Sequence, residues 1–169
     1  YIKKTLKNYN IEIYKILKNR QIKGIPKVYE IIEDEKELII IEEYIHGLTL
    51  DKKYNKTDVE TVKKIMEQLC NILKQLHNMN PPIIHRDIKP TNIIVSNDDV
   101  VYLVDFNISR EYDENQSVDT VIMGTQGYAS PEQCGFAQTD CRSDIYSIGM
   151  LMKNILMVDE YPDKETKSL

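Results

Sequence analysis

The sequence predicts an α+β fold, in which a small partial β-sheet with one helix comes first and a mainly helical part follows. Residues 1–6 show the alternation of side chains that is typical of a β-strand. Two apolar runs at 27–32 and 37–41 flank four charged residues, which indicates a hairpin. Farther along, apolar residues recur at helical spacing from 57 to 77, and this stripe predicts a long core helix.

The bulk composition is that of a folded domain that does not bind nucleic acid. The chain has 169 residues, of which 41% are apolar and 29% charged, enough for one compact core or two small lobes. Its net charge of -5 argues against a surface for nucleic acid. The three cysteines lack metal-ligand spacing, and no apolar run is long enough to span a membrane. We therefore expect a cytoplasmic protein without a membrane segment, and the sequence does not indicate its oligomeric state.

The boundaries of the first helices follow from start and stop signals. A helix is expected at 8–19, where apolar side chains recur at helix-like intervals before a glycine and a proline. A short connector at 42–47 then leaves the sheet. The long core helix is expected to open at Thr57, because Glu60 stands three residues later and completes a capping box.

A second hairpin lies near the middle of the chain. Residues 93–95 and 100–104 are apolar runs on either side of the polar turn 97–99. Because paired strands keep their outer ends together, Asn92 and Asp105 should leave this hairpin at the same end. Both side chains carry oxygen atoms, which are the ligands that Mg²⁺ prefers.

The last third of the chain contains a long polar segment and one more helix. Residues 108–132 are rich in turn-forming residues, and a loop of this length in a compact domain is usually functional or disordered. Residues 145–157 are apolar on most faces of a helix, and we expect this helix to be deeply buried.

Two short motifs carry a family resemblance. Residues 85–92 read H-R-D-I-K-P-T-N, and residues 105–107 read D-F-N. Their order and spacing resemble the catalytic and metal loops of the eukaryotic-type (Hanks-type) protein serine/threonine kinases, with Asn in the place of the last Gly of D-F-G. Residues 117–133 are similar to bacterial members. The resemblance implies a two-lobe protein-kinase-like fold, with a partial small lobe and hinge at 1–45 and a partial larger lobe at 46–169.

The resemblance also implies a role for each residue of these motifs. Asp87 would accept the proton of the attacking hydroxyl, and Lys89 would neutralise the transferred phosphoryl group. Asn92 and Asp105 would hold Mg²⁺, while the Thr125 hydroxyl would reach Asp87 and Lys89. The implied cofactors are ATP and Mg²⁺, and the implied partner is a protein whose Ser or Thr hydroxyl receives the γ-phosphoryl group.

The connector after the first hairpin resembles the hinge that binds adenine in this family. Glu43 and Ile45 are the nearest groups on it, and the resemblance assigns Ile94 to the same nucleotide site. Glu42 stands in the gatekeeper position, directly before the hinge. A glutamate there departs from the family pattern, and the sequence does not explain it.

The family pairs a strand lysine with a helix glutamate. Residues 1–4 resemble V-A-I-K, which makes Lys4 the candidate lysine, and Glu12 is the best glutamate on the following helix. Lys3 remains open, because a slip of one residue would turn the other side chain inward. The alternative interpretation is that both lysines are solvated on an edge strand.

Two motifs after the long loop extend the resemblance. Residues 130–132 read Ser-Pro-Glu and resemble the A-P-E end of an activation segment. Residues 144–149 resemble D-x-W-S-x-G, whose Asp braces the catalytic loop, so Asp144 is expected to be structural. In the family Glu132 would pair with a later arginine, and no arginine follows Arg142 in this sequence.

The long loop also contains candidate sites of regulatory phosphorylation. Thr120 is the first candidate, followed by Ser117 and Thr125. A phosphate there would add a charge of roughly -1.5 to -2, and Arg86 could bind it.

Several departures keep other functions open. No Gly-rich loop precedes Tyr1, and the larger lobe of the family continues beyond Leu169, so we expect a kinase-domain fragment or a degenerate, minimal kinase. Gly readily takes a positive φ and Asn is among the next most tolerant residues, so the metal loop can survive the change at Asn107. The loop would have less freedom to move, which counts mildly against activity. One alternative is a non-catalytic pseudokinase or interaction module. Another is a small-molecule phosphotransferase of the aminoglycoside-kinase type, which the segment 124–132 disfavours.

Overall fold

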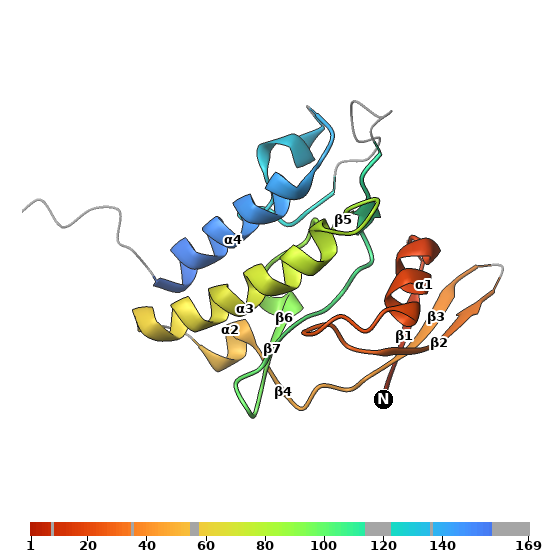
Figure 1. The fold of residues 1–169 in the computed structure, drawn as a ribbon, viewed down its shortest axis with the longest axis horizontal. Coiled ribbons are helices and arrows are strands. Elements are labelled where there is room, and N and C mark those ends of the chain that lie inside the picture. The colour runs from red at the N-terminus through yellow and green to blue at the C-terminus, as the bar shows by residue number, and fades with distance from the viewer. Residues whose placement is uncertain (8, 35, 55–57, 114–122, 136, 157–169) are drawn as a thin grey trace, which may run out of the picture.

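The chain folds into a sheet with one helix and a second part built around two long helices. The computed structural model describes all residues except 8, 35, 55–57, 114–122, 136 and 157–169. Figure 1 shows the sheet and its helix on one side of the molecule and the long helices on the other. The predicted α+β class is confirmed.

A three-stranded antiparallel sheet forms the first part. β1 (Ile2–Leu6) and β2 (Val28–Glu33) both pair with β3 (Leu38–Glu42), which lies between them. The predicted strand and the predicted hairpin are therefore confirmed. Every second side chain of β3 is buried, and the last buried one is Glu42.

The helix α1 (Ile11–Asn19) packs against this sheet. It begins three residues later than expected, because Asn10 is its N-cap and accepts a hydrogen bond from the Glu12 N–H at 3.1 Å. Its buried face is formed by Ile13, Tyr14 and Leu17. Glu12 lies outside this face and is exposed.

The second part contains five short strands and three helices in its described residues. In chain order they are β4 (Gly47–Thr49), α2 (Leu50–Lys53), α3 (Val59–His77), β5 (Ile83–Ile84), β6 (Ile93–Ser96), β7 (Val101–Leu103), β8 (Arg110–Glu111) and α4 (Cys141–Leu156). Short 3-10 helices are formed by Pro90–Asn92 and Pro131–Cys134. The elements α2, β4 and β8 were not predicted, because two to four residues are too few to show a period.

The central hairpin is formed by β6 and β7, as predicted. Ile93 lies opposite Leu103 in the register, and β4 pairs with the other edge of β6. Just outside the hairpin, the Val104 N–H donates to the Asn92 carbonyl oxygen at 2.9 Å. Asn92 and Asp105 therefore leave the hairpin together, which confirms the expected shared end.

The helix α3 supplies most of the core of the second part. Asp58 is its N-cap and accepts a hydrogen bond from the Thr61 N–H at 2.9 Å, whereas the expected cap, Thr57, lies outside the described residues. Val59, at the first position, is exposed rather than part of the apolar stripe. The buried residues are Val62, Ile65, Met66, Leu69, Ile72, Leu73 and Leu76. Among the described residues, no helix is long and apolar enough to cross a membrane.

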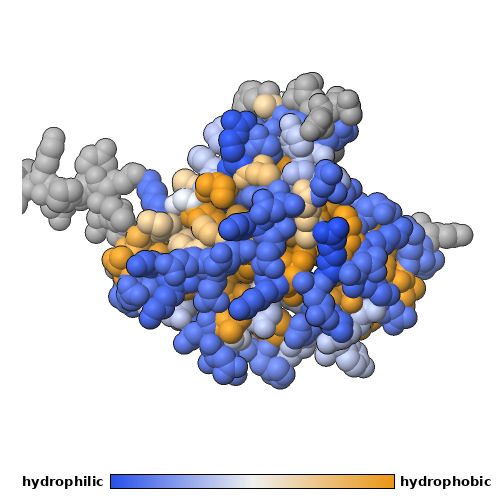
Figure 2. Space-filling view, in the orientation of Figure 1, coloured by the Kyte–Doolittle hydropathy of each residue, from blue (hydrophilic) through white to orange (hydrophobic). Residues whose placement is uncertain are grey.

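The helix α4 corrects the expectation of deep burial on most faces. It begins at Cys141 instead of 145, and α3 and β5 cover only one of its faces. The buried residues are Ser143, Asp144, Ser147, Ile148, Leu151 and Ile155. Ile145, Tyr146 and Met152 are about half exposed on the opposite side. Figure 2 shows hydrophobic residues gathered over this helix among hydrophilic ones, and apolar composition alone did not reveal which face is covered.

Replacing Leu69 by Ala should lower the free energy of unfolding by about 2–5 kcal/mol, because Leu69 is fully buried and the change leaves a cavity. Denaturant unfolding followed by circular dichroism measures the loss. The matched control is Glu67→Ala on the exposed face of α3, which should change stability by less than about 0.5 kcal/mol. Equal effects of the two changes would contradict the position of α3 in the core.

Candidate active site

Between β5 and the 3-10 helix Pro90–Asn92, the chain forms a loop without regular structure that is held by other parts of the molecule. Asp144 on α4 is fully buried, and its two carboxylate oxygens accept hydrogen bonds from the backbone N–H groups of His85 and Arg86, each at 2.9 Å. The His77 ring nitrogen Nε2 lies 2.8 Å from the same carboxylate. Arg86 has a positive φ of 67°, so two anchored amides hold a strained backbone. The expected bracing role of Asp144 is confirmed.

Three predicted residues meet around the carboxylate of a fourth, Asp87. Asn92 Nδ2 donates to Asp87 Oδ2 at 2.8 Å and to the Asp87 carbonyl oxygen at 2.9 Å. Lys89 Nζ lies 2.8 Å from Asp87 Oδ2, while the Thr125 hydroxyl donates to Oδ1 at 2.7 Å. Lys89 Nζ also donates to Thr125 Oγ1 at 2.9 Å. The structure thus brings Asp87, Lys89, Asn92 and Thr125 into one hydrogen-bonded group.

The two candidate metal ligands fit a magnesium ion in the chemistry of their free atoms. The Asn92 NH2 group is occupied by Asp87, so its amide oxygen is the end that can bind a cation. Asp105 Oδ1 is buried and has no hydrogen-bond partner among the described residues, which is costly for a carboxylate without a ligand. No group of three or more His, Cys, Asp or Glu side chains suited to a metal occurs in the described part of the chain. Mg²⁺ commonly binds one or two protein groups and completes its shell with phosphates and water.

Side-chain packing supports the segment that carries Asp105. The rings of His85 and Phe106 meet edge to face with their centroids 4.7 Å apart, and both residues are buried. Burial lowers the pKa of His85, which favours the neutral ring. His85 Nε2 lies 3.2 Å from the Val104 carbonyl oxygen. His85 and Phe106 therefore hold the two loops together by packing.

The helix α1 reaches the metal loop through a hydrogen bond that the sequence did not predict. The buried Tyr14 hydroxyl donates to Asn107 Oδ1 at 2.7 Å. Burial raises the pKa of Tyr14, and the charges of Asp105 and Glu42 raise it further, so the phenol remains a donor. The Asn that replaces the family's Gly thus ties this loop to α1. The only sign of this bond in the sequence was the Asn side chain, whose amide oxygen can accept a hydrogen bond, whereas Gly has no side chain.

The expected ion pair between Lys4 and Glu12 is not formed. Lys4 points inward from β1, whereas Lys3 is exposed, but Lys4 Nζ lies 2.5 Å from Glu42 Oε1. Glu12 pairs instead with Lys15 on the exposed face of α1, at 2.8 Å. The physical reason is helical geometry, because α1 turns its apolar residues to the sheet and Glu12 away from it.

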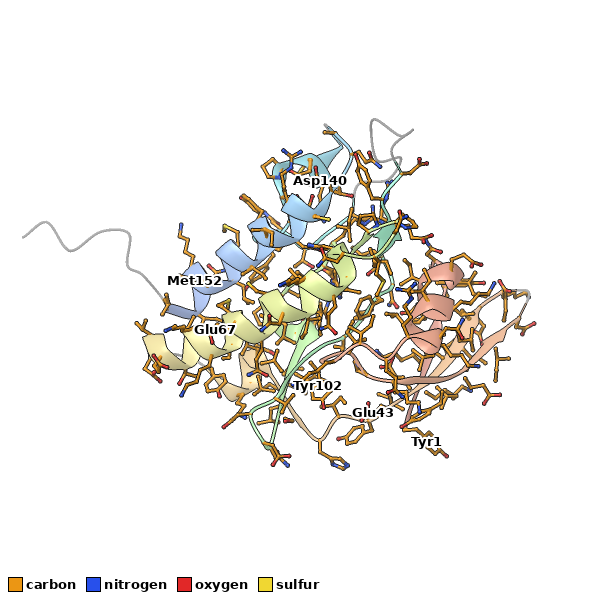
Figure 3. The ribbon with its side chains drawn as sticks, in the orientation of Figure 1. Tyr1, Glu43, Glu67, Tyr102, Asp140 and Met152 are labelled. Carbon is orange, nitrogen blue, oxygen red and sulfur yellow. The ribbon has the colours of Figure 1, made fainter. Side chains whose placement is uncertain are left out.

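The expected adenine-binding connector runs from β3 to β4, and Figure 3 places Glu43 on it. The Glu43 N–H donates to the Lys27 carbonyl oxygen at 2.8 Å, so this N–H is already bonded within the protein. Ile45 is buried. Ile94, the third predicted contact, lies on β6 opposite Tyr102 and is partly exposed.

The segment before α4 is anchored by two residues that the sequence analysis did not identify. Ser143 donates a hydrogen bond to Glu132 Oε1 at 2.6 Å. Partial burial opposes ionisation of Glu132, but this bond and other hydrogen bonds lower its pKa overall. Gln133 Nε2 donates to the carbonyl oxygens of Arg86 at 2.7 Å and Met123 at 3.0 Å. Ser143 thus provides a partner for Glu132 in place of the expected arginine.

Comparison with known families is consistent with these motifs. Residues 2–168 match the family model described as the protein kinase domain. The chain belongs to this family. The resemblance carried by the motifs at 85–92 and 105–107 is thereby confirmed at the level of the family, although the roles of single residues stay predictions.

The similar proteins are bacterial and considerably longer than the matched segment. A probable serine/threonine-protein kinase of Clostridium acetobutylicum is 35% identical over 131 residues, which are 76% of this chain and 20% of that protein. Serine/threonine-protein kinase D of Synechocystis is 33% identical over 133 residues, 75% of this chain and 26% of that protein. Serine/threonine-protein kinase PknB of Mycobacterium tuberculosis is 36% identical over 121 residues, 69% of this chain and 19% of that protein.

Replacing Asp144 by Asn should destabilise the fold by about 1–3 kcal/mol, because an amide has one acceptor oxygen and leaves a buried N–H of the loop without its partner. Urea unfolding monitored by circular dichroism gives the difference. Asp140→Asn is the control, since Asp140 pairs with the exposed Arg142 at the surface and should change stability by less than about 1 kcal/mol. A loss for Asp144→Asn no larger than for the control would argue against the brace.

Proposed function

We propose that this chain is the core of an ATP-dependent protein kinase domain that transfers the γ-phosphoryl group of ATP to a Ser or Thr hydroxyl of a protein. The observation that carries the proposal is the hydrogen-bonded group of Asp87, Lys89, Asn92 and Thr125. At the end of the adjoining hairpin, Asp105 Oδ1 has no hydrogen-bond partner in the described part of the chain. A proton acceptor, a cation and two oxygen ligands are the groups that phosphoryl transfer requires.

The nucleotide would bind between the connector and the two motif loops. The Glu43 carbonyl oxygen and the backbone of Ile45 are the groups available to adenine, and Ile94 would pack against it. Lys4 would contact the phosphates from β1. Asn92 and Asp105 would hold Mg²⁺, which when bound neutralises phosphate charge.

Transfer itself would need Asp87 and Lys89. Asp87 accepts the proton of the attacking hydroxyl as its oxygen forms a bond to the γ-phosphorus, and the bond from that phosphorus to the β–γ bridging oxygen breaks to release ADP. Lys89 Nζ lies beside the Asp87 carboxylate and neutralises charge on the transferred phosphoryl group. The Thr125 hydroxyl holds Asp87 and Lys89 in register, and the lysine is the feature that favours Ser and Thr over Tyr as acceptors.

The Asp87→Asn change should abolish measurable transfer, with a loss of at least about 10²-fold, because an amide cannot accept the proton. Transfer of labelled phosphate from ATP to a generic protein acceptor measures activity in the full chain. A thermal shift with ATP and Mg²⁺ should remain, since bound nucleotide still stabilises the native state.

The matched control is Asp51→Asn, an exposed aspartate on α2, which should transfer phosphate like the parent. Equal incorporation by Asp87→Asn and the parent would refute the assigned base. A parent chain with no thermal shift at millimolar nucleotide would favour the alternative of a non-catalytic pseudokinase or interaction module.

Regulation by phosphorylation is supported by a basic pocket beside the catalytic loop. Among the described residues it has a volume of about 530 Å³ and four cationic side chains in its lining, with no acidic one. These are Lys7, Lys36, Arg86 and Arg110. The proposed sites Thr120 and Ser117 lie outside the described residues. Thr125 is the weaker candidate, because its hydroxyl is bonded to Asp87.

Incubation of the full chain with ATP and Mg²⁺ should therefore place phosphate within residues 108–132, at Thr120 first. Peptide mass spectrometry locates the site. Thr120→Ala should remove that signal, and Thr61→Ala on α3 serves as its control. Modification found only outside 108–132 would show that this regulatory proposal is wrong.

A further inference from the structure

Two charged side chains meet at the end of the otherwise aliphatic buried row of β3. Lys4 Nζ lies 2.5 Å from Glu42 Oε1, and their side chains are 23% and 9% exposed. In the antiparallel register of β1 and β3, Lys4 faces Ile40 and Ile2 faces Glu42. Lys4 and Glu42 are therefore diagonal neighbours on one face, at a spacing that a long side chain can bridge.

The stability of the sheet does not account for this pair. The buried row on β3 consists of Leu38, Ile40 and Glu42, so the first two positions predict an aliphatic residue at the third. Removing a carboxylate and an ammonium group from water offsets much of their attraction, and well-packed apolar residues often stabilise as much. A different reason for two charges at this position is therefore required.

The position of the pair supplies that reason. Glu42 is the last residue of β3 and directly precedes Glu43 on the connector proposed to bind adenine. Lys4 is bonded to Glu42 and is thereby held at the start of this connector.

We propose that Glu42 is the positioning residue of Lys4 and holds the Lys4 ammonium group toward the phosphates of the bound nucleotide. The inference rests on the proposed function, since it needs a nucleotide at this site. Both residues belong to adjacent strands, so the register of one sheet fixes the pair. Glu12 on α1 is bound to Lys15 at the surface and takes no part. A displacement of α1 would therefore leave Lys4 in place.

The test compares the binding of Mg-ATP to five forms of the chain by calorimetry. They are the parent, Glu42→Gln, Lys4→Met, the double variant of these two, and Glu30→Gln as a control on the exposed face of β2. Glu42→Gln should weaken binding about tenfold, the size expected for a lost charged hydrogen bond. The double variant should bind no more weakly than Lys4→Met alone, because Glu42 acts only through Lys4. The control should match the parent within about twofold.

A conservative variant separates positioning from a purely structural role. Glu42→Asp keeps the charge and should bind Mg-ATP more tightly than Glu42→Gln, whereas a role in packing alone would favour the larger Gln. Circular dichroism confirms that each variant is folded. If Glu42→Gln does not fold, Glu42→Asp replaces it in the test. Glu42→Asp is then compared with the parent, and the same comparison is made with Lys4→Met present in both chains.

Three results would overturn the proposal. The first is parent-like binding by Glu42→Gln, or by Glu42→Asp where it takes that place. The second is a further loss when Glu42 is changed in the Lys4→Met background. The third is a loss caused by Glu12→Gln instead. If the parent itself does not bind Mg-ATP, the proposed function fails. The contact between Glu42 and Lys4 is then tested separately through the midpoint of thermal unfolding. Additive effects of the two changes on this midpoint would show that Glu42 does not hold Lys4.

Discussion

A single buried carboxylate determines the shape of the loop that carries Asp87. Asp144 accepts the N–H groups of His85 and Arg86, two consecutive amides that would otherwise be buried without partners. One of them belongs to a residue with positive φ, a conformation that the loop sequence alone does not favour. Asp87 follows at once, so the direction of its side chain depends on a residue of a distant helix.

Around Asp87 the polar groups bind one another in a closed arrangement. The carboxylate is bonded by Asn92 from the short helix after the loop, by Lys89 within the loop, and by Thr125 from the segment before α4. Because these donors come from three places in the chain, each part of the site constrains the others. Such networks specify one geometry when every member is satisfied. The loop that follows Asp105 gains a similar restraint from the bond between Tyr14 and Asn107.

The sequence predicted what has a period or a fixed spacing. The sheet strands, the central hairpin, α3 and the order of the motif residues follow from local patterns. The partner of Lys4 was not predicted, because it depends on a diagonal contact between two strands. Glu12 was the wrong candidate, because each residue of α1 is rotated by about 100° from the one before, which places Glu12 outside the buried face. The burial of α4 was overestimated for a related reason, since Ile145 and Met152 are apolar but lie on the uncovered side.

The distance along the chain between the loop and its brace has a consequence for biosynthesis. Arg86 precedes Asp144 by 58 residues. The ribosome adds residues in order, so the growing polypeptide contains a complete set of motif side chains well before the carboxylate that orders them has been made. The group around Asp87 therefore cannot take its final geometry before Asp144 has been synthesised. Until then the nascent chain contains the motif side chains without the carboxylate that orders their loop.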